Sequence, residues 1–422
     1  MIANANRSQK RRRVVVTGIG AVTPLGNSMN ATWNGMVEGV SVAGPVQRFD
    51  ASGFPTTIGY EVKGFDEAKR PGDVNEGDWP FLNTAGKFGV FAAMEALAQA
   101  TTTGMDPFRT AVCVGNGMGS PDFEWYQRHY LGSQYDAETF RAHARYFPEM
   151  LTAVIARLAA AKAGTTTVHT ACASSGQALG EAYEMIRYGE ADVCVTGGAD
   201  SMVNPYYYAG FSLLGAMSKR NDNPRTASRP FDKDRDGFVL GEGACMLVFE
   251  ELEHALKRGA KPLAEVCGYG VTESAYRITD LHPEGTGPIE AMQMAIDDAG
   301  IDASKVGYIN AHGTSTSLND RIEALAVSKV FPKERCHTFV SSTKSMTGHM
   351  ISAAGAIEFA TCVKALEHQV LPPSVNIVTK DPEVLAMLTP NTPTACKLDF
   401  ALSNSVGFGG SNTALVAGRM AP

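Results

Sequence analysis

The sequence predicts an α/β fold built from two similar halves, and three observations support this prediction. Short β-branched strands alternate along the chain with segments of helical periodicity, as in α/β proteins with mostly parallel sheets. Each half contains a strand, a small-residue turn, a helix and a glycine-rich hairpin; GFVLGEGACMLV from Gly237 resembles GFGGSNTALVAG from Gly407. No long Pro/Ser/Gly linker separates the halves, which favours an extensive shared interface. We therefore divide the chain into residues 1–265 and 266–422.

The predicted strands are short and rich in β-branched or small apolar residues, as buried strands are. They cover residues 13–18, 111–115, 191–197, 246–250 and 306–310. Between them, residues 87–98 and 175–188 have helical periodicity. In the second segment Ala178, Leu179 and Ala182 fall on one face, so we expect that face to be buried.

The composition excludes several classes of protein. The chain has 422 residues, of which 44% are hydrophobic and 19% charged, so it can bury a large core. No apolar run approaches the roughly 20 residues that a bilayer span needs, and the polar, basic N-terminal segment lacks the apolar stretch of a signal peptide. We therefore expect a cytoplasmic protein with no membrane span. A net charge of -7 argues against general nucleic-acid binding.

Motifs for metals, disulfides and nucleotides are missing from the sequence. The 8 cysteines are spread from Cys113 to Cys396 without a C-x-x-C pair, and no histidines cluster at zinc spacing. Near Gly20 the dinucleotide-binding pattern G-x-G-x-x-G fails, because Thr23 stands at the third glycine position. The sequence also has no Walker loop and no G-x-S-x-G elbow. We therefore expect neither a metal site nor a cofactor.

The most informative stretch covers residues 165–189, where a β-branched strand runs into small residues and then into an amphipathic helix. Cys172 stands at the junction. A thiol at a helix N-terminus lies at the positive end of the helix dipole, which favours the thiolate and would make a nucleophile for a thioester carbonyl. An arbitrary cysteine is more often a buried core residue. The small neighbours Ala171, Ala173 and Ser174 favour the nucleophile here, because they leave room for a substrate.

Two further segments place histidines in turns between a strand and a helix. In NAHGTST a strand delivers His312 into a Gly/Thr/Ser turn, and SSTKSMTGH places Lys344 and His349 around another turn. Either histidine alone would more often be structural. Together with Cys172 they predict a site in which a thiolate supplies covalent catalysis and two imidazoles stabilise an enolate by hydrogen bonds.

These motifs resemble those of elongating β-ketoacyl-acyl-carrier-protein synthases, a family with the thiolase-like fold, over nearly the whole chain. The matching landmarks are VVVTGIGAVTPLG, TACASS around Cys172, SKRNDNPRTASRPFDKDRDGFVLGEGA, NAHGTST, SSTKSMTGH and NSVGFGGSN. The resemblance implies two similar α/β halves packed in α-β-α-β-α layers. It also implies an acyltransferase that condenses an acyl-Cys172 thioester with malonyl-acyl-carrier protein and releases carbon dioxide. The pathway would be fatty-acid or type II polyketide or polyene biosynthesis.

The resemblance further implies the roles of the catalytic residues. Cys172 takes the acyl group from a carrier thioester. His312 and His349 then donate hydrogen bonds to the thioester carbonyl of the malonyl unit as it loses carbon dioxide. Lys344 supports the two histidines electrostatically and need not transfer a proton.

Binding residues are implied in the same way. The backbone N–H groups of Cys172 and Phe408 match the oxyanion hole, and the Phe408 side chain matches a gate beside the nucleophile. Thr314 and Thr316 match positions that bind the pantetheine arm. Met118, together with Phe408, matches the lining of the acyl pocket.

The partners implied by the resemblance are an acyl carrier protein and a second ketosynthase-like chain, as a homodimer or as a heterodimer with a chain-length factor. The main alternative function is a non-catalytic partner subunit of the chain-length-factor kind. Such subunits typically replace the nucleophile, so the presence of Cys172 favours catalysis. A plain thiolase is disfavoured because thiolases usually have one histidine and a second cysteine near the site.

Three departures from the family pattern point to a specialised pathway, although fatty-acid elongation stays open. Residues 274–277 replace an Asp-Ala-x-His element, Thr316 is followed by Ser317 instead of proline, and residues 74–88 replace a more basic segment. We expect these changes to surround the acyl and carrier entrances.

Recognition of the carrier has to overcome repulsion between two negatively charged proteins. Carrier proteins are generally acidic, so a chain of net charge -7 is expected to meet them through a local basic patch. The candidates for that patch are Lys63, Lys69, Arg70, Lys219 and Arg220. Related enzymes usually carry an arginine where this chain has Gly215. We therefore expect a docking surface that differs from theirs, and a strong preference for a cognate carrier.

Overall fold

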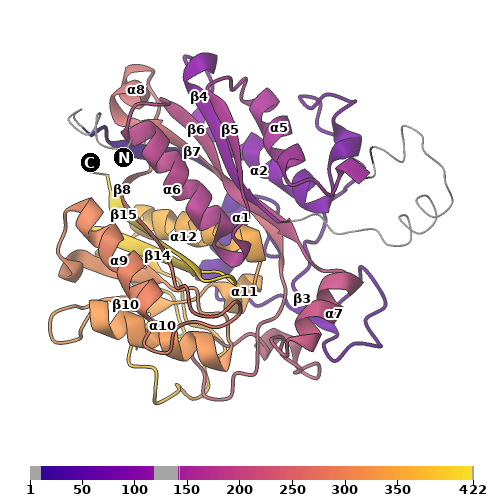
Figure 1. Ribbon diagram of the computed structural model, residues 1–422, viewed down its shortest axis with the longest axis vertical. Helices are drawn as coiled ribbons and strands as arrows, with labels where there is room; N and C mark the ends of the chain where they lie inside the picture. Colours follow the sequence, from indigo (N-terminus) through magenta and orange to yellow (C-terminus); the bar gives the residue numbers. More distant parts are fainter. Residues whose placement is uncertain (1–10, 118–140, 142, 421–422) are drawn as a thin grey trace.

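The structure, a computed structural model, describes residues 11–117, 141 and 143–420. The N-terminal half contributes the strands β1 (Val14–Val22), β4 (Thr110–Asn116), β5 (Gly164–Val168), β6 (Val193–Ser201) and β7 (Glu242–Glu251). The C-terminal half contributes β8 (Ala264–Glu273), β9 (Val306–Asn310), β10 (Phe339–Ser341), β12 (Met387–Leu388), β14 (Phe400–Val406) and β15 (Ser411–Arg419). These strands form one sheet in the order β12-β10-β9-β14-β15-β8-β1-β7-β6-β4-β5 (Figure 1).

Two small ribbons lie outside this sheet. One pairs β2 (Gly44–Pro45) with β3 (Ile58–Gly59), and the other pairs β11 (Val370–Leu371) with β13 (Thr394–Ala395). In the described part of the chain, no helix is long and apolar enough to cross a membrane. All 8 cysteines are described, and all are free thiols.

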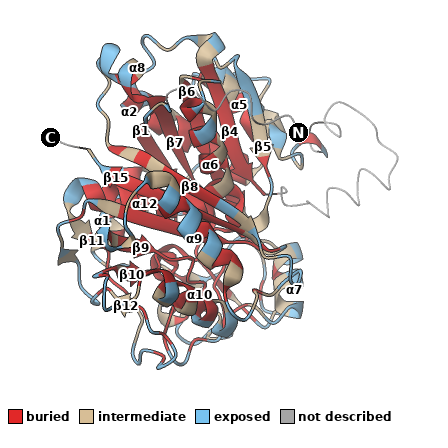
Figure 2. Ribbon diagram, turned by 60° about the vertical axis from the view of Figure 1, so that its left-hand side comes forward, coloured by how far each residue is buried: buried red, intermediate tan, exposed pale blue. Residues whose placement is uncertain are grey.

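Helices form three layers around the two halves of the sheet. On the outer side, α2 (Thr84–Ala100) and α5 (Glu149–Leu158) pack on the N-terminal strands, whereas α9 (Thr286–Ala299) packs on the C-terminal strands and α10 (Ser317–Val330) on α9. Between the halves, α6 (Ser174–Arg187) and α12 (Ala354–His368) contact each other and strands of both halves. The strands and the central helices are mostly buried, and the outer helices expose one face (Figure 2). The predicted α-β-α-β-α layering is confirmed.

Shorter helices connect these layers. They are α1 (Met29–Val37), α7 (Pro205–Leu213), α8 (Leu252–Lys257) and α11 (Lys344–Thr347). In Figure 1, α7 lies beside β3 at the lower right of the molecule, far from α8 at the upper left.

The two halves repeat one strand arrangement. Read toward the centre of the sheet, the order β5-β4-β6-β7-β1 in the first half corresponds to β10-β9-β14-β15-β8 in the second, which has β12 as an additional edge strand. The halves join where β1 and β8 pair antiparallel, with Val14 opposite Val266 and Val16 opposite Ala264. The proposed division near residue 265 falls at the start of β8 and stays a prediction.

The expectation of mostly parallel strands is wrong. Among the strand pairs of the described sheet, five are parallel and five are antiparallel. The five predicted strand positions are occupied, but β14 and β15 are joined by the short turn at residues 407–410 and therefore run in opposite directions. Parallel neighbours need a longer crossover, which here exists only for the outer strands of each half.

A glycine contact sets the distance between the two central helices. A Cβ atom added to Gly355, in the first turn of α12, would lie 2.7 Å from the backbone nitrogen of Gly176 in the first turn of α6. No side chain other than hydrogen fits at this distance. The close approach brings together the segments that immediately precede the two helices, and these segments carry Cys172 and His349.

We expect Gly355→Ala to lower the free energy of unfolding by roughly 1–3 kcal/mol, because the added methyl group must push two backbones apart. Chemical denaturation with a linear extrapolation measures this change. Gly210→Ala in α7 is the matched control, since its Cβ atom would meet no atom within 4 Å. An equal loss of stability in both variants would show that the α6–α12 contact tolerates a side chain.

Candidate active site

Cys172 lies in a tight turn between a strand and a helix. β5 ends at Val168, a 3₁₀ turn covers Ala171–Ala173, and α6 begins at Ser174. Ala171 has a φ of +48°, a conformation that residues with a side chain rarely adopt. No side chain of the described residues caps the N-terminus of α6, which directly follows the turn that holds the thiol. The turn leaves Cys172 only 4% exposed.

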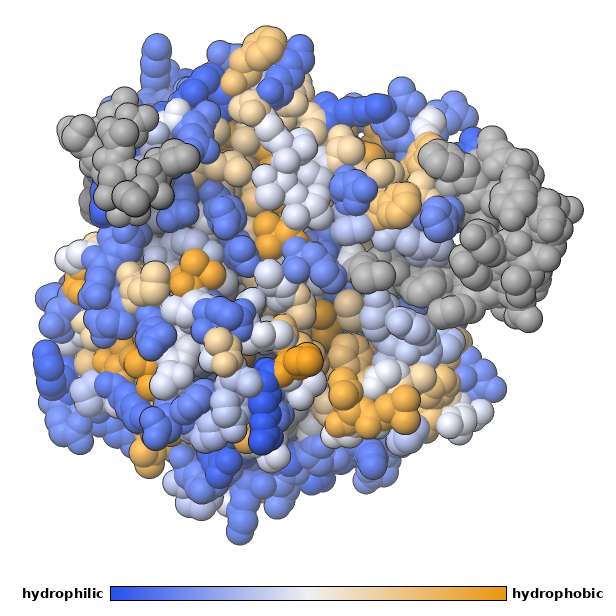
Figure 3. Space-filling view, viewed as in Figure 1, coloured by the Kyte–Doolittle hydropathy of each residue, from blue (hydrophilic) through white to orange (hydrophobic). Residues whose placement is uncertain are grey.

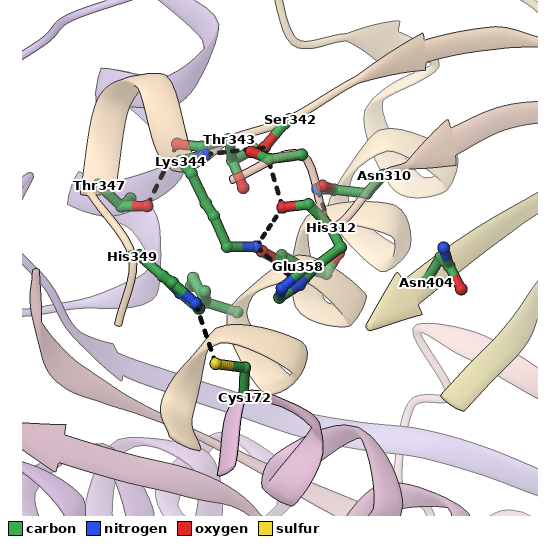
Figure 4. A network of polar contacts seen from close by, with 12 residues as sticks. Cys172, Asn310, His312, Ser342, Thr343, Lys344, Thr347, His349, Glu358 and Asn404 are labelled. Atoms are coloured by element: carbon green, nitrogen blue, oxygen red, sulfur yellow. Dashed lines mark hydrogen bonds and ion pairs between the residues drawn. The ribbon is translucent and has the colours of Figure 1, made fainter. Parts of the chain in front are cut away.

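His349 faces Cys172 from the second half. Two hydrogen bonds hold its backbone. The His349 N–H donates to the carbonyl oxygen of Val239, and the His349 carbonyl oxygen accepts from the Gly241 N–H. Its ring nitrogen Nε2 lies 3.1 Å from Cys172 Sγ (Figure 4). The Phe238 ring packs edge-on against the imidazole at a centroid distance of 5.4 Å. Cys172 and His349, two of the residues predicted for the site, therefore lie in contact.

The other ring nitrogen of His349 has no protein partner among the described residues. In a Ser-His-Asp triad a carboxylate fixes the imidazole in one tautomer. Among the residues that the structure describes, no such carboxylate holds Nδ1 of His349. Nε2 can therefore serve as a proton acceptor in one step and as an N–H donor in another.

His312 lies beside His349 and is tied to a buried ion pair. The two imidazoles pack edge-on with ring centroids 5.2 Å apart. Lys344 Nζ lies 2.5 Å from the His312 carbonyl oxygen and 3.3 Å from its Nδ1, and it forms an ion pair with Glu358 (Figure 4). Lys344 and Glu358 are each 1% exposed. A buried charge needs such a partner, and Glu358 supplies it.

A second buried carboxylate, that of Glu323, binds the loop that carries His312. The backbone N–H groups of His312 and Gly313 each donate to Glu323 at 2.7 Å. Asn404 on β14 donates to the same carboxylate at 2.7 Å. Glu323 on α10, itself held by Asn404 on β14, thus holds the His312 loop in one position.

Burial controls the protonation states of the site. Burial raises the pKa of the Cys172 thiol to about 12, although the Lys344 charge and the Phe408 N–H group oppose this rise. The pKa of His312 and the pKa of His349 lie well below the usual 6.5. Burial is the larger cause, and the Lys344 charge is the second. At neutral pH the site therefore contains a thiol and two neutral imidazoles. Burial thus acts against the stabilisation of the thiolate that is expected from the helix N-terminus, and that expectation stays a prediction.

A pocket leads from the surface to this group. Its volume is about 290 Å³, and Cys172, His312 and His349 lie among its lining residues. Thr314, Thr316 and Phe408 also line it. The Thr314 and Thr316 hydroxyls are 2.9 Å apart, and Thr316 also caps α10 by accepting from the Asn319 N–H. The structure thus brings together all the predicted site residues except Met118, which lies outside the described residues.

The atoms of Cys172, His312 and His349 that could bind a metal ion, namely the sulfur and the ring nitrogens, all lie within 4.8 Å of one another. Thiolate sulfur and imidazole nitrogen are also zinc ligands. In the described part of the chain, this is the one group of His, Cys, Asp and Glu residues whose spacing would suit a metal ion.

Two models of known families match the chain. The N-terminal domain of β-ketoacyl synthase matches residues 11–255, and the C-terminal domain matches residues 263–378. The chain belongs to the β-ketoacyl synthase family. It is 39% identical to the 3-oxoacyl-[acyl-carrier-protein] synthase 2 of Synechocystis sp., over 96% of this chain and 98% of the relative. The synthase of the same name from Coxiella burnetii is also 39% identical, over 97% and 99%.

Solved ketosynthases have the same fold. A type II PKS acyl-carrier protein in complex with its ketosynthase bound to the hexaketide, AntDE:AntF, matches with a TM-score of 0.88 and 31% identity, over 98% of this chain and 100% of that one. The ishigamide ketosynthase/chain length factor matches with a TM-score of 0.87 and 33% identity, over 98% and 100%. Like them, this chain has the thiolase-like fold, and its intact Cys172, His312 and His349 favour a catalytic ketosynthase over a chain-length factor.

Two residues of this ketosynthase site were missed from the sequence, namely Glu323 and Glu358. Both stand within apolar helical segments, RIEALA and AAGAIEFA, and both are buried. A carboxylate on an apolar helix face is rarely buried without a partner. That signal could have predicted a buried polar network beside the histidines.

Some predicted surface features lie elsewhere. Lys63, Lys69 and Arg70 are not among the residues that line the pocket, and neither is any residue of the segment 74–88. In that segment Trp79 and Leu82 pack into the core beneath α2. Residues 74–88 therefore do not line the described pocket, whereas Ser317 does, and their expected place around the acyl and carrier entrances stays a prediction.

The raised pKa of Cys172 predicts a pH profile for its alkylation. We expect the rate of modification by iodoacetamide to rise about tenfold per pH unit between about pH 7 and pH 9, because only the thiolate reacts and its fraction grows tenfold per unit below the pKa. Mass spectrometry of the peptide containing Cys172 measures this rate, and an exposed cysteine in a model peptide levels off near its pKa of about 8.5. A plateau for Cys172 below pH 8 would mean that the N-terminus of α6 outweighs burial.

Proposed function

We propose that this ketosynthase condenses an acyl-Cys172 thioester with malonyl-acyl-carrier protein, releasing carbon dioxide and forming a β-ketoacyl-carrier thioester. One observation supports this proposal most directly. A thiol and two neutral imidazoles converge at the end of a pocket that opens to the surface, with Nε2 of His349 3.1 Å from Cys172 Sγ. These are the groups that thioester exchange and enolate stabilisation require.

The first step is acyl transfer to Cys172. The sulfur attacks the carbonyl carbon of the acyl-carrier thioester while its proton passes to Nε2 of neutral His349. Backbone N–H groups of Cys172 and Phe408 stabilise the oxyanion of the tetrahedral intermediate. The carrier thiolate then leaves and takes the proton from His349. The products are an acyl-Cys172 thioester and a free carrier thiol.

The second step is decarboxylation and condensation. The malonyl thioester carbonyl accepts hydrogen bonds from Nε2 of His312 and Nε2 of His349. The bond to the carboxylate breaks, carbon dioxide leaves, and the electron pair forms an enolate on the thioester. The enolate carbon attacks the acyl carbonyl, and the Cys172 thiolate leaves and takes a proton from solvent. The new β-ketoacyl chain is two carbons longer and stays on the carrier.

Lys344 acts as a positioning residue in this scheme. Its charge lowers the pKa of both histidines, and its contacts hold the His312 ring through the carbonyl oxygen and Nδ1. Neutral imidazoles can donate N–H hydrogen bonds to the growing enolate charge without first losing a proton. Thr314 and Thr316, on the pocket wall, bind the pantetheine arm.

We further propose the cellular setting of the enzyme. Its partners are an acyl carrier protein and a second ketosynthase-like chain, either identical or of the chain-length-factor kind. The solved relatives include a ketosynthase with its acyl-carrier protein and a ketosynthase/chain length factor, which supports these partner classes. The pathway is type II polyketide, polyene or fatty-acid biosynthesis in the cytoplasm.

Intact-mass analysis tests the proposed function directly. The protein is incubated with a panel of acyl-carrier thioesters, and the mass of each acyl group retained on the chain is read. We expect a single acyl adduct that maps to Cys172 and disappears when malonyl-carrier is added. The absence of any acyl adduct on Cys172 across the panel would contradict the proposal.

A further inference from the structure

Apolar side chains surround the mouth of the pocket. Leu214, Ile278 and Leu318 line the pocket and are 55%, 81% and 37% exposed. Leu213, which precedes Leu214 at the end of α7, is 90% exposed. We call these four residues the apolar rim. A group of large apolar side chains with this much exposure is more often an interaction surface than an ordinary part of the surface.

The apolar rim comes from three separate parts of the fold. Leu213 and Leu214 end α7, Ile278 stands in the loop after β8, and Leu318 lies in the first turn of α10. Figure 3 shows hydrophobic side chains gathered over the region of α7. Because Leu214, Ile278 and Leu318 line the pocket, a molecule that covers the rim also covers the mouth.

Charge at the mouth does not attract an acidic partner. The lining residues include Asp236 and Asp280 but no lysine or arginine among the residues that the structure describes. Arg220 lies 3.7 Å from Asp236, and Arg277 lies 3.3 Å from Asp280, so these two arginines are already paired. Gly215, where related enzymes usually carry an arginine, also lines the mouth.

We propose that the acyl carrier protein docks on the apolar rim through an apolar face beside its pantetheine, and that charge attraction contributes little. This proposal rests on the proposed function, because a carrier that delivers a thioester to Cys172 must place its body over this mouth. The chain carries a net charge of -7, and the two carboxylates at the mouth are balanced by Arg220 and Arg277, so the described lining of the mouth offers an acidic carrier no net positive charge. Burial of the rim is then the main attraction between the two protein surfaces, beside the binding of the pantetheine arm in the pocket.

Docking on the apolar rim and docking on a basic patch predict different results for salt dependence and for the choice of carrier. Apolar contacts are not screened by salt, whereas attraction between exposed charges falls as ionic strength rises. The KM for the acyl-carrier substrate should therefore change little, by less than about threefold, between about 50 mM and about 500 mM salt. A carrier without a matching apolar face should bind poorly even when it is strongly acidic.

The test uses the full chain, one acyl group and two donors, namely an acyl-carrier protein and the small-molecule N-acetylcysteamine thioester. Leu213 is changed to Asp and, separately, to Lys, because these substitutions remove the same apolar contact with opposite charge. We expect both variants to raise the KM for the acyl-carrier by roughly tenfold, which corresponds to about 1.4 kcal/mol. Acylation of Cys172 by the small thioester should stay within about twofold of the parent, because Leu213 does not line the pocket.

Leu256→Asp is the matched control, since Leu256 is a 53% exposed leucine on α8, far from the mouth. It should leave both donors unaffected. A lower KM for the acyl-carrier in Leu213→Lys, or a steep salt dependence of the parent, would overturn apolar docking in favour of a basic patch. An unchanged KM in both Leu213 variants would remove the rim from the docking surface. If the parent fails to become acylated even by the small thioester, the proposed function itself fails.

Discussion

Cys172→Ala is expected to abolish acyl loading and condensation while the chain stays folded. The thiol is the only group that forms the covalent intermediate, so the loss of activity should exceed that of any other single substitution. Alanine keeps a small side chain in the turn between β5 and α6, and the contact that it removes is the one between Sγ and Nε2 of His349. The measurements are the mass of the chain after incubation with acyl-carrier, and the rate of β-ketoacyl product formation.

Cys396→Ala provides the control for loss of a thiol, because Cys396 lies partly exposed and outside the pocket. It should load and condense at the parental rate. Thermal unfolding should show that both variants keep the parental midpoint to within a few degrees. Normal acyl-enzyme formation in Cys172→Ala would mean that another residue is the nucleophile.

The second large effect concerns the histidines. His312→Ala and His349→Ala should each slow decarboxylation of malonyl-carrier by roughly 10²–10³-fold, because each removes a preorganised donor to the developing enolate. Both variants should still permit some acylation of Cys172. His349→Ala should load more slowly than His312→Ala, since Nε2 of His349 is the ring nitrogen in contact with Cys172 Sγ. Release of labelled carbon dioxide measures the decarboxylation rate, and intact mass measures loading.

His337→Ala is the control, because His337 is exposed and does not line the pocket. Its decarboxylation rate should equal that of the parent. Parental decarboxylation rates in both His312→Ala and His349→Ala would rule out enolate stabilisation by these rings, even if acyl loading on Cys172 were confirmed.

Local patterns in the sequence predicted each catalytic segment but not its environment. The strand, small-residue turn and helix around Cys172 form a local pattern, and β5, the turn and α6 follow it closely. The burial that raises the pKa of Cys172 was not predicted, because it depends on how much protein surrounds the thiol. Strand direction was wrong for the inner strands, because a strand has the same composition whichever way its neighbour runs.

Neither carboxylate of the polar network was assigned a role from the sequence. Glu323 and Glu358 act on a backbone loop and on Lys344, and these partners lie on other elements. The apolar rim was missed for the same reason. Leu213, Ile278 and Leu318 look like ordinary surface residues until the fold places them around one opening.

By itself, the sequence determined the α/β class, the positions of the main strands, and the identities of the nucleophile and its two imidazoles. Tertiary structure alone decided that Cys172 and His349, 177 residues apart, lie 3.1 Å from each other. Sequence patterns report local backbone preferences and which face of an element is buried. The distance between side chains on different elements depends on how those elements pack, and here it depends on two helices that approach closely at Gly176 and Gly355.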